Sequence, residues 1–173
     1  MYSAGQFVLF AYMAPVMRDQ VGLSIEQFSF VLIWLGTCGV IGNLLISQFI
    51  DRLGAARVVN IAMLMIAVPL LLFPLVTNIW LSLVLMVPWG MVFIAVHAAQ
   101  QARQINTAPE LASATMALST SGMYIGQGLG AVIGGVILAA GHMSWLGPVG
   151  AMILALGIGL SYLSSQSRIQ NIK

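Results

Sequence analysis

Long stretches of apolar residues without any charge alternate with short polar segments along this chain. The uncharged stretches cover residues 1–17, 27–50, 58–102 and 111–167. A helix needs about 20 mainly apolar residues to cross the hydrocarbon core of a bilayer. The second stretch therefore has room for one such helix, and each of the two longest stretches has room for two. Turn-forming residues stand where these must divide, from Pro74 to Asn78 and at Gly141 and His142.

Together with the first stretch, this division predicts six membrane-spanning helices. Their expected limits are residues 1–17, 25–48, 57–76, 79–102, 110–140 and 143–165. The strands of a membrane barrel would alternate apolar and polar residues, whereas segments such as residues 61–73 are apolar throughout. A helix also satisfies its own backbone hydrogen bonds in lipid. The pattern predicts an all-α membrane protein whose residues 1–173 form a single six-helix bundle.

Composition and charge agree with a membrane protein and also predict its orientation. Hydrophobic residues make up 60% of the chain and charged residues 6%, against about 25% charged residues in soluble domains. The few basic residues form no stripe, so nucleic acid is not an expected partner. Short cytoplasmic loops carry an excess of Lys and Arg, so we expect both termini in the cytoplasm. The residues on that side would be Arg52, Arg57, Arg103, Arg168 and Lys173, with Arg18 opposite.

The segment between the second and third predicted spans, residues 47–57, contains an Asp-Arg pair at a helix end, a glycine and a further base. Its sequence, SQFIDRLGAAR, resembles the signature loop of the major facilitator superfamily, Gly-x-x-x-Asp-Arg-x-Gly-Arg-Arg/Lys. Asp51, Arg52 and Gly54 fit this pattern. Ser47 replaces its first glycine, and Arg57 stands one position beyond the paired bases.

Two later segments extend the resemblance. Residues 101–114 are similar to the loop between spans ten and eleven of the drug and sugar efflux branch, and residues 122–135 are similar to span eleven of that branch. The resemblance runs from Met1 to about residue 165. It implies the C-terminal six-span half of a twelve-span proton antiporter, which is one half-bundle of the major facilitator fold with its 3+3 inverted repeat.

The resemblance also implies a function. Such a protein performs secondary active efflux of a small organic solute or drug by alternating access, in which two six-helix bundles rock about a midplane site. We therefore expect the partners to be the lipid bilayer, a small-molecule substrate and a second bundle, either an N-terminal half or a homodimer partner. The expected location is the bacterial inner (plasma) membrane. No cofactor or metal is expected, and for coupling to protons His97 is the intramembrane titratable candidate.

Polar and aromatic groups inside the spans are the candidates for contact with substrate, because polar groups in lipid cost free energy. In the fourth predicted span, Gly90, Phe93, His97 and Gln101 follow helical spacing and form one stripe. The resemblance places this span beside the central cavity. The other cavity candidates are Gln6 and Phe10 in span one, Trp34 and Asn43 in span two, and Tyr124 and Gln127 in span five. Ordinary interhelical packing and hydrogen bonding is the alternative role for each of them.

Glycines recur every four residues in the fifth predicted span, at Gly122, Gly126, Gly130 and Gly134. Small residues at this spacing let another helix backbone approach closely. A dinucleotide-binding loop would need an acidic residue about 20 positions later, and none follows Glu110. The resemblance places this helix where two half-bundles meet, so we expect the glycine flank to pack against a companion bundle.

The signature segment has two readings that coexist. The resemblance implies a cytoplasmic gate made of Asp51, Arg52, Gly54 and Arg57, in which Asp51 faces the start of a helix in the other half, where the helix dipole favours an anion. The alternative is that these charges only fix the orientation in the membrane.

Three other functional classes remain open. A non-transporting membrane subunit and an inactive fragment would share the same pattern of spans. An intramembrane serine protease would need Gly-x-Ser-Gly and a histidine on a later span. Here Ser121 and Gly122 are preceded by Ser119 and Thr120, and His97 comes earlier in the chain. We therefore predict that the protein is not an enzyme.

Overall fold

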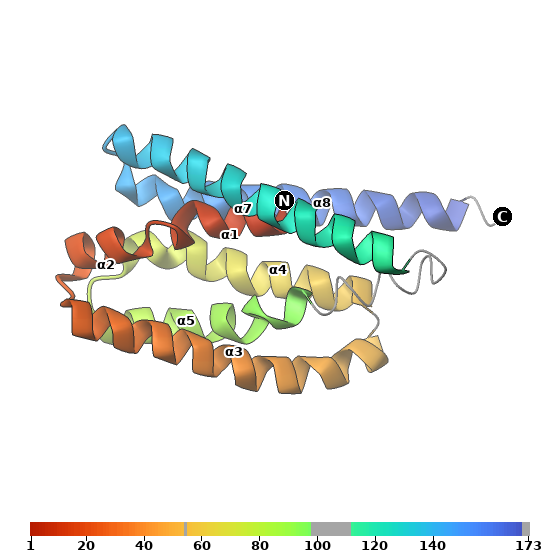
Figure 1. Ribbon diagram of the computed structural model, residues 1–173, viewed down its shortest axis with the longest axis horizontal. Coiled ribbons are helices and arrows are strands. Elements are labelled where there is room, and N and C mark those ends of the chain that lie inside the picture. The colour runs from red at the N-terminus through yellow and green to blue at the C-terminus, as the bar shows by residue number, and fades with distance from the viewer. Residues whose placement is uncertain (54, 98–111, 171–173) are drawn as a thin grey trace.

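The computed structural model consists of helices that lie along one common direction (Figure 1). It describes the backbone of residues 1–53, 55–97 and 112–170, and the side chains of residues 1–45, 57–97 and 113–162. The elements in chain order are α1 (Tyr2–Phe10), α2 (Met13–Val21), α3 (Ile25–Leu53), α4 (Ala55–Leu72), the 3-10 helix η1 (Phe73–Leu75), α5 (Ile79–Phe93), α7 (Ala112–Ala139), the 3-10 helix η3 (Met143–Trp145) and α8 (Leu146–Gln170).

Among the described residues, five segments are helical, long and apolar enough to cross a membrane. They are Ile25–Leu45, Arg57–Leu75, Ile79–His97, Ser113–Ala139 and Met143–Tyr162. Each lies in one of the predicted spans from the second to the sixth. The chain is therefore an integral membrane protein made of helices. The segment predicted as the first span is not among the five, and a sixth span stays a prediction.

The first predicted span is not one continuous helix over residues 1–17. It is divided by a turn at Ala11 and Tyr12 into α1 and α2, and α2 continues to Val21. Proline lacks a backbone N–H, and its ring clashes with the carbonyl four residues earlier. For Pro15 that carbonyl belongs to Ala11, so the break falls where the proline requires it. The first predicted span therefore consists of two helices, and the second of them extends beyond residue 17.

The turns between the other helices lie where the sequence predicts them. Asn78 accepts a hydrogen bond from the backbone N–H of Leu81 at 2.8 Å and so caps the start of α5. Gly141, after the end of α7, has φ of 76°, a left-handed conformation in which a side chain would be strained. Asn78 thereby pairs one of the backbone N–H groups that the start of a helix leaves without a partner. Gly141 allows the chain to turn at the end of α7.

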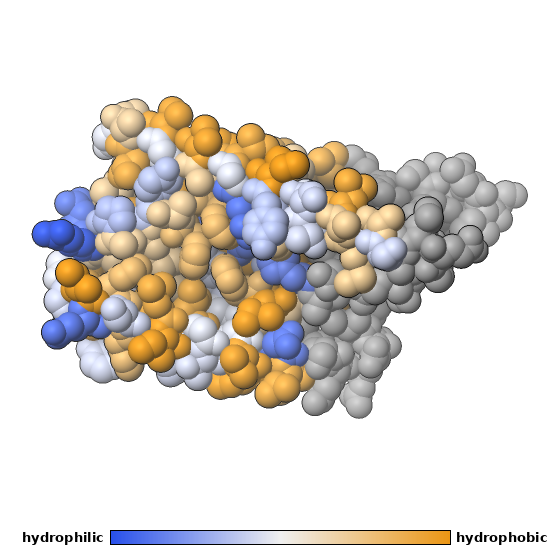
Figure 2. All heavy atoms as spheres, viewed as in Figure 1, coloured by the Kyte–Doolittle hydropathy of each residue, from blue (hydrophilic) through white to orange (hydrophobic). Residues whose placement is uncertain are grey.

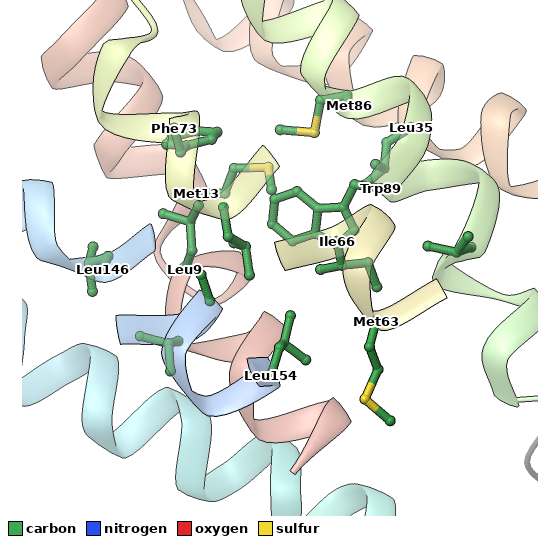
Figure 3. Close-up of a cluster of buried hydrophobic side chains, with 14 of the residues drawn as sticks. Leu9, Met13, Leu35, Met63, Ile66, Phe73, Met86, Trp89, Leu146 and Leu154 are labelled. Carbon is green, nitrogen blue, oxygen red and sulfur yellow. The ribbon is translucent and has the colours of Figure 1, made fainter. Parts of the chain in front are cut away.

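Buried side chains from α1 to α5 and from α8 meet in one core (Figure 3). The largest fully buried side chains include Trp89 of α5, Phe73 of η1 and Leu9 of α1. In Figure 1, α3 and α5 lie on one side of the bundle, with α7 and α8 on the other. None of the buried core residues described belongs to α7. This helix is attached mainly through its contact with α1.

Candidate functional site

The face between α1 and α5 brings together four of the predicted site residues and their neighbours. The rings of Tyr2 and His97 meet edge to face with centroids 5.4 Å apart, and those of Phe10 and Phe93 are 5.3 Å apart. The Tyr2 hydroxyl donates a hydrogen bond to the Phe93 carbonyl at 3.4 Å. Tyr2 and Phe10 lie on one face of α1, Phe93 is the last residue of α5 and His97 follows shortly after it, so the rings form a row.

Gln6 lies between the two aromatic contacts, one helical turn after Tyr2 and one before Phe10. Its side chain is fully buried, at 0% exposure, and neither amide atom has a hydrogen-bond partner among the residues described. An unpaired polar group in an apolar interior costs about 1–3 kcal/mol. The α1–α5 face, defined as Tyr2, Gln6, Phe10, Phe93 and His97, therefore holds a fully buried amide that makes no hydrogen bond of good geometry with the described residues.

Trp89 is the residue of this site that sequence reasoning missed. Its ring contacts Phe10 edge to face at 6.2 Å, and its indole nitrogen is buried without a hydrogen-bond partner among the described residues. The signal was present in the sequence, because Trp89 stands four residues before Phe93 and so lies on the same helical face.

The cavity candidates on α3 and α7 lie apart from this face. Trp34 donates a hydrogen bond from Nε1 to the Leu83 carbonyl at 3.0 Å, which joins α3 to α5. Asn43 is half-buried on α3. On α7, Tyr124 is 62% exposed and Gln127 is half-buried, and neither belongs to the row of rings. Trp34 thus has a structural contact, while Tyr124 and Gln127 lie on the helix outside the core.

The glycine flank of α7 packs within the chain, which corrects the expectation of a companion bundle. A Cβ added at Gly126 would lie 3.2 Å from Ser3, and one at Gly130 or Gly134 would overlap the carbonyls of Ala4 or Val8. These partners belong to α1. Gly122 has nothing within 4 Å of such a Cβ. Small residues at this spacing indicate that another helix approaches closely, but they do not identify which helix it is.

A second glycine contact joins α3 to α5. An added Cβ at Gly39 would meet Ile94, the residue directly after α5, and one at Gly42 would overlap the backbone of Met91 in α5. One at Gly90 would lie 2.7 Å from Cys38 and 2.8 Å from the Leu35 carbonyl. Gly90, predicted as part of the polar stripe, is therefore a packing residue that faces α3. Helical spacing alone places it near Phe93 and His97 but cannot separate these roles.

The signature segment is only partly described. Asp51 and Arg52 lie in the last turn of α3, where the backbone is helical, and Arg57 is exposed in the first turn of α4. The side chains of Asp51 and Arg52 lie outside the described residues, as do Gly54 and Gln101 entirely. The structure therefore does not test the gate. Among the residues it describes, no three His, Cys, Asp or Glu side chains gather to hold a metal ion.

The fold and the site together define the class of this protein. It is an integral membrane bundle of helices whose internal face carries aromatic rings and an amide. A sequence model of the Major Facilitator Superfamily matches residues 1–169, and the chain belongs to that superfamily. Its members are transporters rather than enzymes. The chain is 28% identical over 162 residues to a protein of Pasteurella multocida (strain Pm70) described as "Probable sugar efflux transporter". The match covers 92% of this chain but only 40% of that relative.

Proposed function

We propose that this chain forms one six-helix bundle of a secondary transporter that exports a small organic solute by alternating access with a second bundle. The observation that carries this proposal is the unpaired amide of Gln6 on the α1–α5 face, with aromatic rings on both sides. Superfamily membership supports the transport class, and the sugar efflux relative supports the direction.

A sixth span and a 3+3 inverted repeat belong to this proposal. In it, α1 with α2 forms the first span, and the first three spans are related to the last three. In such a repeat, α1 with α2 corresponds to α5, α3 to α7, and α4 to α8. The α3–α5 contact then corresponds to the α7–α1 contact, and the α1–α8 contact corresponds to the α5–α4 contact. All four helix pairs pack against each other. Glycines mediate both the α3–α5 and the α7–α1 contacts, which is the correspondence that an internal repeat would produce.

The proposed substrate is a sugar or a similar polyol. Aromatic rings offer apolar faces to the C–H groups of such a solute, and an amide can both donate and accept hydrogen bonds. Gln6 is flanked by Tyr2 and Phe10 on its own helix, and Phe93 and His97 stand opposite. If protons drive export through this bundle, His97 would carry them, because it is the titratable side chain on this face that changes charge near neutral pH.

The proposed setting is the bacterial inner membrane with both termini in the cytoplasm. Figure 1 places the last turn of α3, the first turn of α4 and the end of α8 at the same end of the bundle. Basic residues concentrate in the sequence of these segments, and a basic excess marks the cytoplasmic side. In this orientation Asp51, Arg52, Gly54 and Arg57 would act as the gate against a second bundle. That bundle would be an N-terminal half or another copy of this chain.

The proposal is tested by sugar flux in everted membrane vesicles. Three preparations are compared: the chain alone, the N-terminal half of the Pasteurella multocida relative alone, and the two halves fused. We expect accumulation of labelled sugar only in the fused form. Flux by the chain alone would support a homodimer, and no flux in any form would favour the non-transporting subunit or the inactive fragment.

A pair of variants in the fused protein then tests the site. Gln6→Leu removes the amide at similar volume and is expected to lower flux about tenfold or more, because the loss of a substrate hydrogen bond leaves substrate groups unpaired. Ser82→Ala is the matched control, since Ser82 is equally buried but bonds the Ile79 carbonyl of its own helix at 2.6 Å. Equal flux in both variants and the unmodified fusion would remove Gln6 from the transport path.

A further inference from the structure

A cavity of about 390 Å³ opens between α2 and α3, away from the α1–α5 face. It exists because α2 ends at Val21, the next residue Gly22 adopts φ of 70°, and the chain then reverses to begin α3 at Ile25. The two helices meet at one end of the bundle, at the left of Figure 1. A cavity of this size lies within the range that binds small ligands, about 300–1,000 Å³.

The lining of this α2–α3 cavity is apolar except for one charge and one hydroxyl. Pro15 and Arg18 face it from α2, while Leu23, Ile25 and Phe28 form the opposite wall. Arg18 is the one charged residue in the lining. The neighbouring acids, Asp19 and Glu26, are exposed and do not line the cavity. A cation beside an apolar wall fits a ligand that is itself anionic at one end and apolar at the other.

The depth of the cavity matches the boundary between headgroups and acyl chains. The candidate span of α3 begins at Ile25, so the turn before it lies at the membrane surface. Arg18 stands four residues before Gly22, which places it about 6 Å along the helix from that turn at 1.5 Å per residue. Figure 2 shows hydrophilic residues gathered at this end of the molecule and hydrophobic ones beyond it. Arginine at such a depth extends its guanidinium to the interface.

We propose that the α2–α3 cavity binds one phospholipid, with its phosphate on the Arg18 guanidinium and an acyl chain along Leu23, Ile25 and Phe28. Guanidinium and phosphate pair through two parallel hydrogen bonds, which favours arginine over lysine at such a site. A soluble phosphate would leave the apolar wall uncovered. This proposal depends on the chain lying in a membrane and does not depend on transport.

Lipid retention by the purified chain in detergent tests the proposal, with native mass spectrometry as the readout. The probes are phosphatidylglycerol, a diacylglycerol with the same chains but no phosphate, and glycerol phosphate without chains. The variants are Arg18→Gln, Arg18→Lys and, as a matched control, Arg57→Gln, which removes an exposed arginine near the opposite end of α3. Ala14→Trp fills the cavity from an exposed position while keeping Arg18.

The expected result is retention of phosphatidylglycerol by the unmodified chain and by Arg57→Gln, with about a tenfold loss in Arg18→Gln, since a charged hydrogen bond is removed. Arg18→Lys should restore part of the binding, and Ala14→Trp should abolish it. Diacylglycerol and glycerol phosphate should each bind more weakly than the intact lipid. Equal retention in Arg18→Gln and Arg57→Gln, or undiminished retention in Ala14→Trp, would overturn the proposal. Binding of either partial probe as strong as that of the whole lipid would overturn it too.

Discussion

Replacing Gly130 by alanine should push α7 away from α1 and weaken the contact between the two helices. The added methyl would overlap the Ala4 carbonyl oxygen and lie 3.0 Å from both the Ala4 carbonyl carbon and the Phe7 Cβ. Ordinary contacts between such atoms are about 3.5–4.0 Å, so the two helices must separate by a few tenths of an ångström to 1 Å. The obstacle is backbone, which cannot rotate away as a side chain can.

The magnitude follows from comparison with a second glycine of the same helix. Gly128 has nothing within 4 Å of an added Cβ. Alanine is about 0.8–1.0 kcal/mol more favourable than glycine within a helix, and this gain is common to Gly130→Ala and Gly128→Ala. Their difference therefore isolates the overpacking cost, which is about 1–3 kcal/mol. For a chain of this size, 2 kcal/mol corresponds to about 4–8 °C in melting temperature.

The assay is thermal unfolding of the two variants in the same detergent, followed by the loss of helical circular dichroism. We expect Gly128→Ala to melt at or above the temperature of the unmodified protein and Gly130→Ala to melt several degrees below Gly128→Ala. Equal melting temperatures for the two variants would refute the reasoning, because they would show that the α1–α7 contact contributes nothing measurable to the free energy of unfolding.

Three further predictions concern single contacts. Trp34→Phe keeps an aromatic ring, although a smaller one, and removes the donor to the Leu83 carbonyl. At about 0.6 kcal/mol for an interhelical hydrogen bond in a membrane, the melting temperature should fall by at least about 1–2 °C, and no fall would show that the bond is not formed. Gly141→Ala places a side chain on a residue with left-handed backbone conformation, which costs about 1 kcal/mol. The melting temperature should therefore fall by about 2–4 °C, and a higher melting temperature would contradict the left-handed turn at this position. Asp51→Asn in the fused transporter should reduce sugar flux while the amount in the membrane is unchanged, and full flux would dismiss the gate role.

Hydropathy and turn residues predict the later helices well, because each turn carries a local signal. The limits of α5 and α7 are set by Asn78 and Gly141, whose conformational preferences do not depend on distant contacts. The break in the first span was not predictable in the same way. Pro69 and Pro88 lie inside α4 and α5, which nevertheless run through them, whereas the helix is broken before Pro15, at Ala11 and Tyr12. Surrounding helices decide which proline is accommodated, and the sequence does not name those neighbours.

For the candidate site, too, the features set within one helix were predictable and the contacts between helices were not. Helical spacing placed Gln6 with Phe10, and Phe93 with His97, because spacing is a property of one helix. Contacts between helices depend on packing over the whole bundle. The sequence therefore could not separate Gly90, which faces α3, from the ring-bearing residues beside it, and it assigned the glycine flank of α7 to another bundle instead of to α1.

The pairing of α1 with α7 also sets the order in which the protein can assemble. Tyr12 donates a hydrogen bond to the Ala131 carbonyl, 119 residues later in the chain. During synthesis the first helix reaches the bilayer long before the segment that covers it has been translated, and contacts between such distant segments form slowly. Until then the side of α1 that packs against α7 has no helix to cover it. A ribosome that stalls before α7 has been translated would leave behind a nascent chain with that side uncovered.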